Sequence, residues 1–204
     1  MCNRYRVSAK QIDIAKQFGF PLDKLMPEPE PLPPPELFPK KPGWVVRKHD
    51  GDLSLDVMKW GIPRRMRGKS GKPIVSYVTN VRNLESSFWR STIANPHYRC
   101  LVPVTEFCEW SGEKGSKQEH WFSLPAAPIF TFAGIWRPTS EGNCYAFLTC
   151  DANPLVAPIH EKAMPVVLHD EDYERWLDGD VDEVCSLAQP FPSQLLSVGT
   201  GSRG

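Results

Sequence analysis

Short apolar segments separated by turn residues fill most of the chain, and this pattern limits its fold more than any other feature. Several segments alternate apolar and polar side chains, as strands with one buried face do. Predicted strands cover residues 43–47, 53–57, 99–104, 107–110, 120–124, 129–136, 143–150 and 164–168. Because few segments have helical periodicity, we predict an α+β fold with a mixed, barrel-like sheet and a few peripheral helices.

Four short stretches carry the start and stop signals of helices. Ser8 and Gln11 form a capping-box pattern before an apolar face that ends at Gly19. Asp170 and Asp180 are typical N-cap residues. The predicted helices cover residues 8–18, 83–90, 170–177 and 180–187.

The length of 204 residues suits one domain, so we predict a single domain over residues 1–204. Residues 21–42 are rich in proline, which excludes a helix or a central strand and favours an extended segment on the surface. The basic stretch after Pro63 predicts a mobile loop, and the glycine-rich end at residues 199–204 predicts a disordered tail.

The formal net charge is zero, with 24 basic and 24 acidic residues. This balance argues against a protein that coats nucleic acid by bulk attraction. The charges are nevertheless unevenly placed, because one short stretch is basic and the stretch from 170 to 183 is acidic. The basic stretch holds Arg64, Arg65, Arg67, Lys69 and Lys72. It suits either a limited contact with a few phosphates or a plain solvated loop.

No apolar run approaches the ~20 residues needed to cross a bilayer, and no signal-peptide pattern opens the chain. We therefore expect a cytoplasmic protein with no membrane partner. The six cysteines include no C-x-x-C pair, so we expect free thiols, no zinc site and no other metal or organic cofactor.

Cys2 directly follows the start methionine, and its side chain is small enough for a methionine aminopeptidase to remove Met1. The mature chain would then begin with an amine and a thiol on adjacent carbons. These groups titrate at about 7.7–8.0 and near 8.5, so both are partly nucleophilic at neutral pH. Together they convert an aldehyde into a five-membered thiazolidine, whereas an amine alone stops at a reversible imine. The alternative is an incidental cysteine on a frayed terminus.

Two further residues have settings that suit proton transfer. Glu109 lies between Cys108 and Trp110, after an apolar strand, and partial desolvation would raise its pKa. His160 lies between a turn and a buried strand. The alternatives are a solvent-facing glutamate and a structural histidine.

Three polar or aromatic residues suit ligand binding instead. Asn80 and Arg82 could hold a carbonyl or a phosphate, or could simply form a turn. Trp60, before Gly61, is either a core residue or an exposed surface on which a base stacks.

Seven segments in the same order together resemble the SRAP family (SOS-response-associated peptidases), the abasic-site processing proteins. The segments are Met1-Cys2-x-Arg4-Tyr5, Trp60-Gly61-Ile62-Pro63, Asn80-x-Arg82 with Glu85, Arg99-Cys100-Leu101-Val102-Pro103, Phe107-x-Glu109-Trp110, Thr131-Phe132-Ala133-Gly134-Ile135-Trp136, and Ile159-His160 followed by Met164-Pro165-Val166-Val167-Leu168. They run from end to end of the chain.

The resemblance implies an SRAP fold with the N-terminus at the floor of a basic cleft for single-stranded DNA. It assigns catalytic roles to Cys2, Asn80, Glu109 and His160. It also implies DNA contacts by Arg4, Trp60, Arg82, Arg90 and Lys162.

The chain departs from the family pattern at several positions near these segments. Asn3 stands where the family usually has Gly, and Val81 where Ala is common. Leu37-Phe38-Pro39 stands where the family has an Asn-x-Ala-Pro segment. These changes affect the implied DNA contacts more than the implied chemistry.

The activity that the resemblance implies is a covalent crosslink between Cys2 and an abasic site in single-stranded DNA, which shields the lesion during the DNA damage response. The enzyme would be of lyase or hydrolase type, with removal of Met1 by the protein itself as a peptidase activity. We expect a monomer that associates with the nucleoid when it binds DNA. Two alternatives stay open: a cysteine peptidase or N-terminal-nucleophile hydrolase that uses Cys2 with His160, and a non-covalent single-stranded DNA-binding module.

Overall fold

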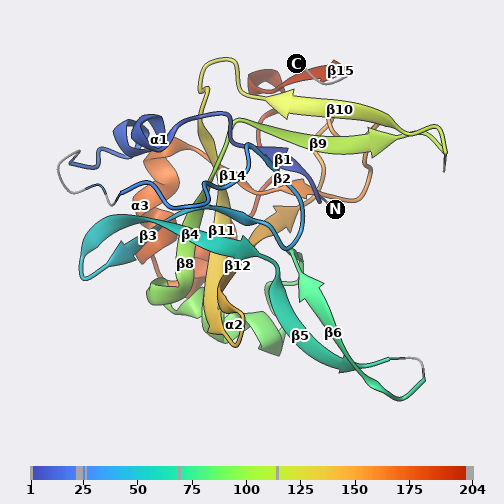
Figure 1. Ribbon diagram of the computed structural model, residues 1–204. Helices are drawn as coiled ribbons and strands as arrows, with labels where there is room; N and C mark the ends of the chain where they lie inside the picture. Colours follow the sequence, from blue (N-terminus) through green and yellow to red (C-terminus); the bar gives the residue numbers. More distant parts are fainter. Residues whose placement is uncertain (1, 22–24, 26, 69, 114, 201–204) are drawn as a thin grey trace.

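Five strands close into a small barrel at the centre of the protein (Figure 1). The computed structural model describes residues 2–21, 25, 27–68, 70–113 and 115–200. Within it the ring runs β4–β3–β8–β11–β12 and returns to β4. The strands are β3 (Pro42–His49), β4 (Asp52–Trp60), β8 (Arg99–Val104), β11 (Phe130–Thr139) and β12 (Gly142–Cys150). The predicted α+β fold with a barrel-like sheet is confirmed.

The barrel is mixed because β12 pairs in parallel with β4 and antiparallel with β11. A short strand, β7 (Asn80–Val81), also pairs in parallel with β12. Two further strands, β13 (Met164–Pro165) and β14 (Val167–Leu168), pair antiparallel with β12 and β11, respectively. The predicted strand over 164–168 is therefore two strands that pair with different partners.

A second sheet of five strands includes the start of the chain. Its order is β15–β10–β9–β1–β2. The strands are β1 (Tyr5–Arg6), β2 (Glu36–Leu37), β9 (Glu106–Ser111), β10 (Gln118–Ser123) and β15 (Ser197–Thr200). Since β1 lies between β9 and β2, the first residues are held on both sides by backbone pairing rather than left at an edge.

Aromatic side chains fasten this second sheet to the barrel. Tyr5 is buried and makes edge contacts with Trp60 and Phe147, with ring centroids 5.1 and 6.1 Å apart. Its hydroxyl bonds to that of Tyr145. This contact needs Gly43, because a Cβ at that position would overlap both tyrosine hydroxyls.

The helices lie around the barrel and are short. They are α1 (Gln11–Gln17), α2 (Ser87–Ala94), α3 (Tyr173–Asp178) and α4 (Val181–Ser186), with the 3₁₀ helices η2 (Pro96–Tyr98), η3 (Asp170–Asp172) and η4 (Ser193–Leu195). Asp180 caps α4 as predicted. Helix α1 starts later than predicted, since the amide of Ser8 donates to Thr105 Oγ1 and Lys10 is the N-cap. Helix α2 starts four residues later than predicted, with Ser86 as its cap.

The prediction of a mobile loop after Pro63 was wrong, and the prediction of a disordered tail was wrong for its first two residues. The basic stretch after Pro63 is a β-hairpin, β5 (Ile62–Arg67) with β6 (Pro73–Val78), and six residue pairs join its strands. Gly71 adopts a left-handed φ of 76° in its turn, which explains why glycine-rich sequence accompanies regular strands here. Gly199 and Thr200 belong to β15, so the predicted tail is ordered there, and 201–204 lie outside the described residues.

The proline-rich stretch, residues 21–42, supplies the edge strand of the second sheet. It contains β2, the last strand of the second sheet, and the chain enters β3 at Pro42. Among the described residues no helix is long and apolar enough to span a membrane.

Candidate active site

The side chain of Asn80 holds Cys2 in place just before β1. Asn80 Nδ2 donates to the backbone carbonyl of Cys2 over 2.8 Å, and the Cys2 thiol donates to the carbonyl of Arg4 over 3.4 Å. Cys2 is fully buried. Burial, and after it the charge of Glu109, raise the pKa of this thiol well above its ordinary value. At neutral pH the thiol is therefore protonated and needs a base before it can act as a nucleophile.

Glu109 is the buried carboxyl beside this thiol. It lies on β9 and is only 2% exposed, and its charge interacts with that of Cys2. Burial raises the pKa of Glu109 to about 7, because water no longer stabilises the ionised form. A carboxyl with this pKa can both give and take a proton at neutral pH.

His160 follows a turn built by Asn153, whose side chain accepts from the amides of Leu155 and Val156. The Nδ1 atom of His160 lies 2.8 Å from the carbonyl oxygen of Ala163. Since a carbonyl only accepts, Nδ1 carries the proton in the neutral ring and Nε2 has the lone pair. Burial lowers the pKa of His160, so the ring is neutral at pH 7.

The pKa values of Glu109 and His160 share one electrostatic influence. After the larger effect of burial, a positive charge at the amino end of the chain lowers the pKa of both groups. Two side chains from different elements, β9 and the turn before β13, therefore both respond in their pKa to a charge at the amino end.

Two buried acceptors near Cys2 have no hydrogen-bond donor among the described residues. They are Oδ1 of Asn80 and Oε1 of Glu109. Buried oxygens without a donor are rare in folded proteins, and each one calls for an explanation. A ligand that brings an amine or hydroxyl group into this site would satisfy them.

Arg4, predicted to bind DNA, already has two carboxylate partners. Its guanidinium forms ion pairs with Glu36 and Glu119 and lies over the rings of Phe38 and Trp121. In this arrangement a phosphate would have to compete with both carboxylates for Arg4.

The other predicted phosphate-binding residues are on the surface. Arg82 pairs with Asp151, and Arg90 lies 2.6 Å from Glu85. Both arginine side chains are about two-fifths exposed, at 42% and 43%. Lys162 is exposed and follows His160 by two residues.

Of the two alternatives for Trp60, the structure supports a core residue and not an exposed surface for base stacking. Its ring is 0% exposed and stacks on Phe147 with centroids 5.3 Å apart, while Nε1 donates to the carbonyl of Thr79. Trp60 ends β4 where the barrel closes, so its indole fills the core and offers no face to a base.

Sequence patterns did not point to His120, which lies beside Glu109. The two residues are cross-strand partners in the β9–β10 hairpin, and His120 Nε2 lies 2.7 Å from the hydroxyl of Ser111. The polar neighbours of His120 in the sequence do not show which residue of the other strand it pairs with. The Gly-containing turn between the two strands predicts only that a hairpin forms.

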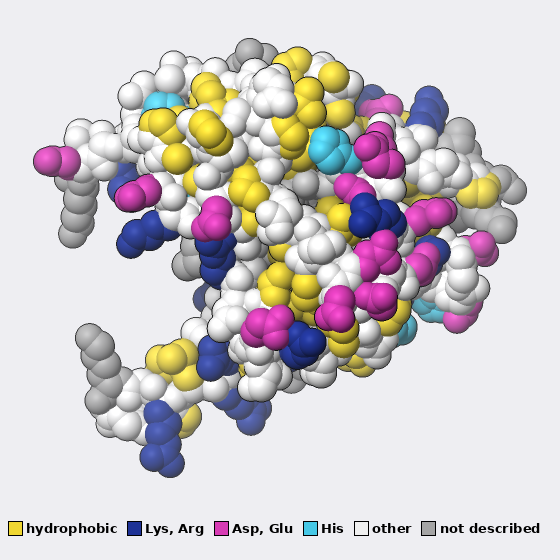
Figure 2. Space-filling model, turned by 180° about the vertical axis from the view of Figure 1, so that it is seen from behind, with side chains coloured by type: hydrophobic (Ala, Val, Ile, Leu, Met, Phe, Trp, Pro, Cys, Tyr) yellow, Lys and Arg dark blue, Asp and Glu magenta, His cyan; other side chains and the backbone are white. Residues whose placement is uncertain are grey.

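A hollow opens beside the N-terminus. Figure 2 shows it at the left of that view, between two projecting parts of the molecule, with Lys and Arg side chains on both walls. Figure 1 identifies these parts as the β5–β6 and β9–β10 hairpins, with the N-terminus between them.

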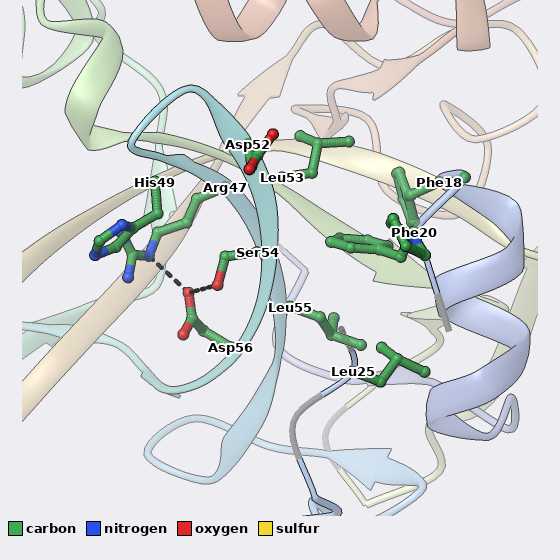
Figure 3. Close-up of a pocket in the computed structure, with 12 residues that line it drawn as sticks. Phe18, Phe20, Leu25, Arg47, His49, Asp52, Leu53, Ser54, Leu55 and Asp56 are labelled. Carbon is green, nitrogen blue, oxygen red and sulfur yellow. Dashed lines mark hydrogen bonds and ion pairs between the residues drawn. The ribbon is translucent and has the colours of Figure 1, made fainter. Parts of the chain in front are cut away.

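A separate cavity of about 600 Å³ lies between the end of α1 and strands β3 and β4 (Figure 3). Phe18 and Phe20 form an apolar wall. On the polar wall, Asp56 accepts from Arg47 over 2.7 Å and from Ser54 over 3.1 Å. These polar groups satisfy one another, and the predicted catalytic residues do not line this cavity. Among the described residues no group of three or more His, Cys, Asp or Glu could hold a metal ion.

A family model described as SOS response associated peptidase (SRAP) matches residues 1–201. The chain belongs to the SRAP family. The resemblance inferred from the seven sequence segments is thereby confirmed.

Curated relatives of this SRAP protein carry a common name. It is 28% identical over 209 residues to the abasic site processing protein YoqW of Bacillus subtilis, covering 97% of this chain and 91% of the relative. It is also 28% identical over 171 residues to the abasic site processing protein HMCES of Gallus gallus, covering 67% of this chain and 51% of that protein.

Solved structures share the fold of this SRAP protein. A protein from Bacteroides thetaiotaomicron superposes with a TM-score of 0.77 at 23% identity, over 99% of this chain and 93% of the other. A protein from Bordetella bronchiseptica gives 0.78 at 22% identity, over 98% and 100%.

Proposed function

We propose that this SRAP protein recognises abasic sites in single-stranded DNA and forms a covalent thiazolidine with them through Cys2, after Met1 is removed. The names of the curated relatives support the choice of lesion. The chemistry is supported by one observation above all. Cys2 is held by its carbonyl beside a buried carboxyl, Glu109, whose Oε1 has no donor among the described residues.

The first step joins nitrogen to the sugar. An abasic deoxyribose exists partly as an open chain with an aldehyde at C1′. The freed amine of Cys2 attacks this carbon, and the resulting carbinolamine loses water to give an imine. Glu109, with a pKa of about 7, protonates the departing hydroxyl and takes up the proton that the nitrogen loses.

The second step closes the ring. The sulfur of Cys2 adds to the imine carbon, and the thiol proton ends on the nitrogen, so no further atom is gained or lost. Glu109 is the nearby base that the protonated thiol needs. The product is a stable five-membered ring, and the whole sequence releases one water molecule.

His160 assists at the sugar. Its Nδ1 proton is held by Ala163, so Nε2 can accept the proton of the C1′ hydroxyl and return it to the ring oxygen as the bond between C1′ and that oxygen breaks. Arg82, Arg90 and Lys162 would hold phosphates of the strand around this site. The chain would act as a monomer in the cytoplasm, at the nucleoid when bound to DNA.

The test is denaturing electrophoresis of the protein after incubation with single-stranded DNA that carries one abasic site. Wild-type protein should give a heat-stable adduct. Cys2→Ser keeps the amine but loses the sulfur, so it should give only an imine that borohydride traps. A heat-stable adduct of Cys2→Ser without borohydride would refute the proposal.

The same gel separates the alternative functions. A cysteine peptidase would form an acyl-enzyme with peptides and no DNA adduct, and a non-covalent DNA-binding module would form no adduct at all. A peptidase nucleophile needs a lowered thiol pKa, whereas burial raises the pKa of Cys2.

A further inference from the structure

The β5–β6 hairpin projects from the body of the protein on one side of the hollow (Figures 1 and 2). Six residue pairs hold its two strands together, from Ile62 with Val78 at the base to Arg67 with Pro73 near the tip. Only the base is anchored in the core, where Ile62 is 2% exposed, whereas residues 64–67 and 72–75 are exposed. The hairpin is therefore an arm with regular backbone and a free outer half.

This arm carries only one sign of charge. The sequence from Ile62 to Val78 contains no Asp or Glu but five basic residues, although the whole chain has zero net charge. Four of these lie within the described residues: Arg64, Arg65, Arg67 and Lys72.

The arginines of the arm differ from the other candidate DNA-binding arginines in having no carboxylate partner among the described residues. Arg4, Arg82 and Arg90 are each ion-paired within the protein. Arg64 lies 5.0 Å over the ring of Phe88 on α2, which fixes it against the body. Since an unpaired guanidinium has no internal bond to lose, it can bind a phosphate more favourably than a paired one.

Arg65 and Arg67 lie on the same face of the arm. Their cross-strand partners are Val75 and Pro73, so no acidic side chain stands opposite them. Two positions on one face of a strand are about 7 Å apart, which allows each guanidinium to reach a different phosphate.

We propose that the β5–β6 hairpin is a basic arm that binds the phosphate backbone of the DNA strand flanking the abasic site. The inference rests on the proposed function, because it takes the DNA to be already seated at Cys2. The five steps from Ile62 to Arg67 span about 17 Å, so the arm is long enough to reach DNA beyond the lesion itself. The arm thus adds affinity for DNA that extends beyond the lesion, and it takes no part in the chemistry.

The experiment compares the double variant Arg65→Gln/Arg67→Gln with Lys10→Gln/Lys16→Gln. The control removes the same charge at the start of α1 and inside it, away from the arm (Figure 1). Binding is measured against salt on a long single strand with a tetrahydrofuran abasic analogue, which has no aldehyde and cannot crosslink. Thermal unfolding of each variant checks that the fold is kept.

Loss of two phosphate contacts should lower the slope of log affinity against log salt by about 1.4, since each contact on single-stranded DNA contributes about 0.7. The wild type should then lose about sevenfold more affinity than the arm variant between ~50 and ~200 mM salt. On a strand with about two nucleotides on each side, too short to follow the arm, the variant should match the wild type. The control variant should match the wild type on both the long and the short single-stranded DNA.

An arm variant with the wild-type slope on the long strand would overturn the inference. So would an equal loss in the control or an equal loss on the short strand, because the contact would then be general charge attraction. Failure of the proposed function would give a different result. The wild type would then form no adduct with aldehyde-bearing DNA, whether or not the arm variant lowers the salt slope.

Discussion

Asn80 binds Cys2 through the backbone carbonyl, which takes no part in thiazolidine formation. The bond therefore fixes the residue while its nitrogen and sulfur stay available for reaction. Because this environment is buried, it also keeps the Cys2 thiol protonated. Glu109, with a pKa of about 7, is the nearby group that can accept the thiol proton.

Asn80→Asp replaces the amide donor with a carboxylate that cannot donate to the Cys2 carbonyl. The rate of adduct formation at saturating DNA should fall by about 100-fold, because small displacements of a reacting group carry penalties of this size. Affinity for DNA with the tetrahydrofuran analogue should change little. Single-turnover kinetics and equilibrium binding give the two values. A variant with a normal rate and weak binding would show that Asn80 contacts DNA instead of positioning Cys2.

The stability of the protein should report the buried carboxyl of Glu109. Folding raises its pKa from 4.5 to about 7, so the folded state favours the protonated form. This favourable contribution is complete below about pH 4.5 and is lost as the pH rises through about 7, where the cost reaches at most about 3 kcal/mol.

Glu109→Gln should remove this dependence, so the variant should become more stable relative to the wild type between pH 5 and pH 8. Urea denaturation at several pH values measures the difference. Exposed Glu174→Gln is the matched control and should follow the wild type. Parallel curves for wild type and Glu109→Gln across this range would contradict the burial of an ionisable carboxyl.

At the scale of elements, strand alternation predicts the barrel but not the hairpin arm. Leu53, Leu55 and Val57 alternate with polar residues, and a strand is found there. In the outer half of the arm both faces of the hairpin are exposed to solvent. Apolar and polar residues therefore do not alternate along its sequence. Strand β1 could not be predicted from the local sequence, since its two residues pair with Glu36–Leu37 and Glu106–Phe107, which lie far along the chain.

The same limit explains which parts of the site sequence reasoning finds. Glu109 stands out because apolar neighbours in its own strand imply desolvation, and the structure buries it. The ion pairs of Arg4 with Glu36 and Glu119 join residues more than thirty positions apart, and no local pattern reports them. Trp60 could not be assigned either, because core and exposed tryptophans have the same local sequence.

The core position of Trp60 leads to a prediction at the scale of the barrel. Trp60→Phe keeps an aromatic ring but leaves a cavity beside Phe147 and removes the bond to Thr79, so stability should fall by about 2–4 kcal/mol. Affinity per folded molecule for DNA should stay unchanged. Thermal unfolding and binding to the analogue strand test both. A loss of affinity at full stability would restore the stacking role that burial argues against.

For the whole molecule, the two sheets bring the start of the chain between the two projecting hairpins that flank the hollow (Figures 1 and 2). A chain with zero net charge and one basic arm attracts DNA at the arm and has little non-specific attraction for DNA over the rest of its surface. Cys2, Asn80 and Glu109 are far apart in the sequence and lie close together in the structure, so the site depends on the complete fold.

The most direct measurement of the central claim is the intact mass of the protein–DNA adduct, followed by peptide mapping of the attachment site. The account predicts the mass of the chain without Met1 plus that of the DNA, less one water molecule, with the DNA on Cys2. An adduct that retains Met1, or that maps to any residue other than Cys2, would contradict it.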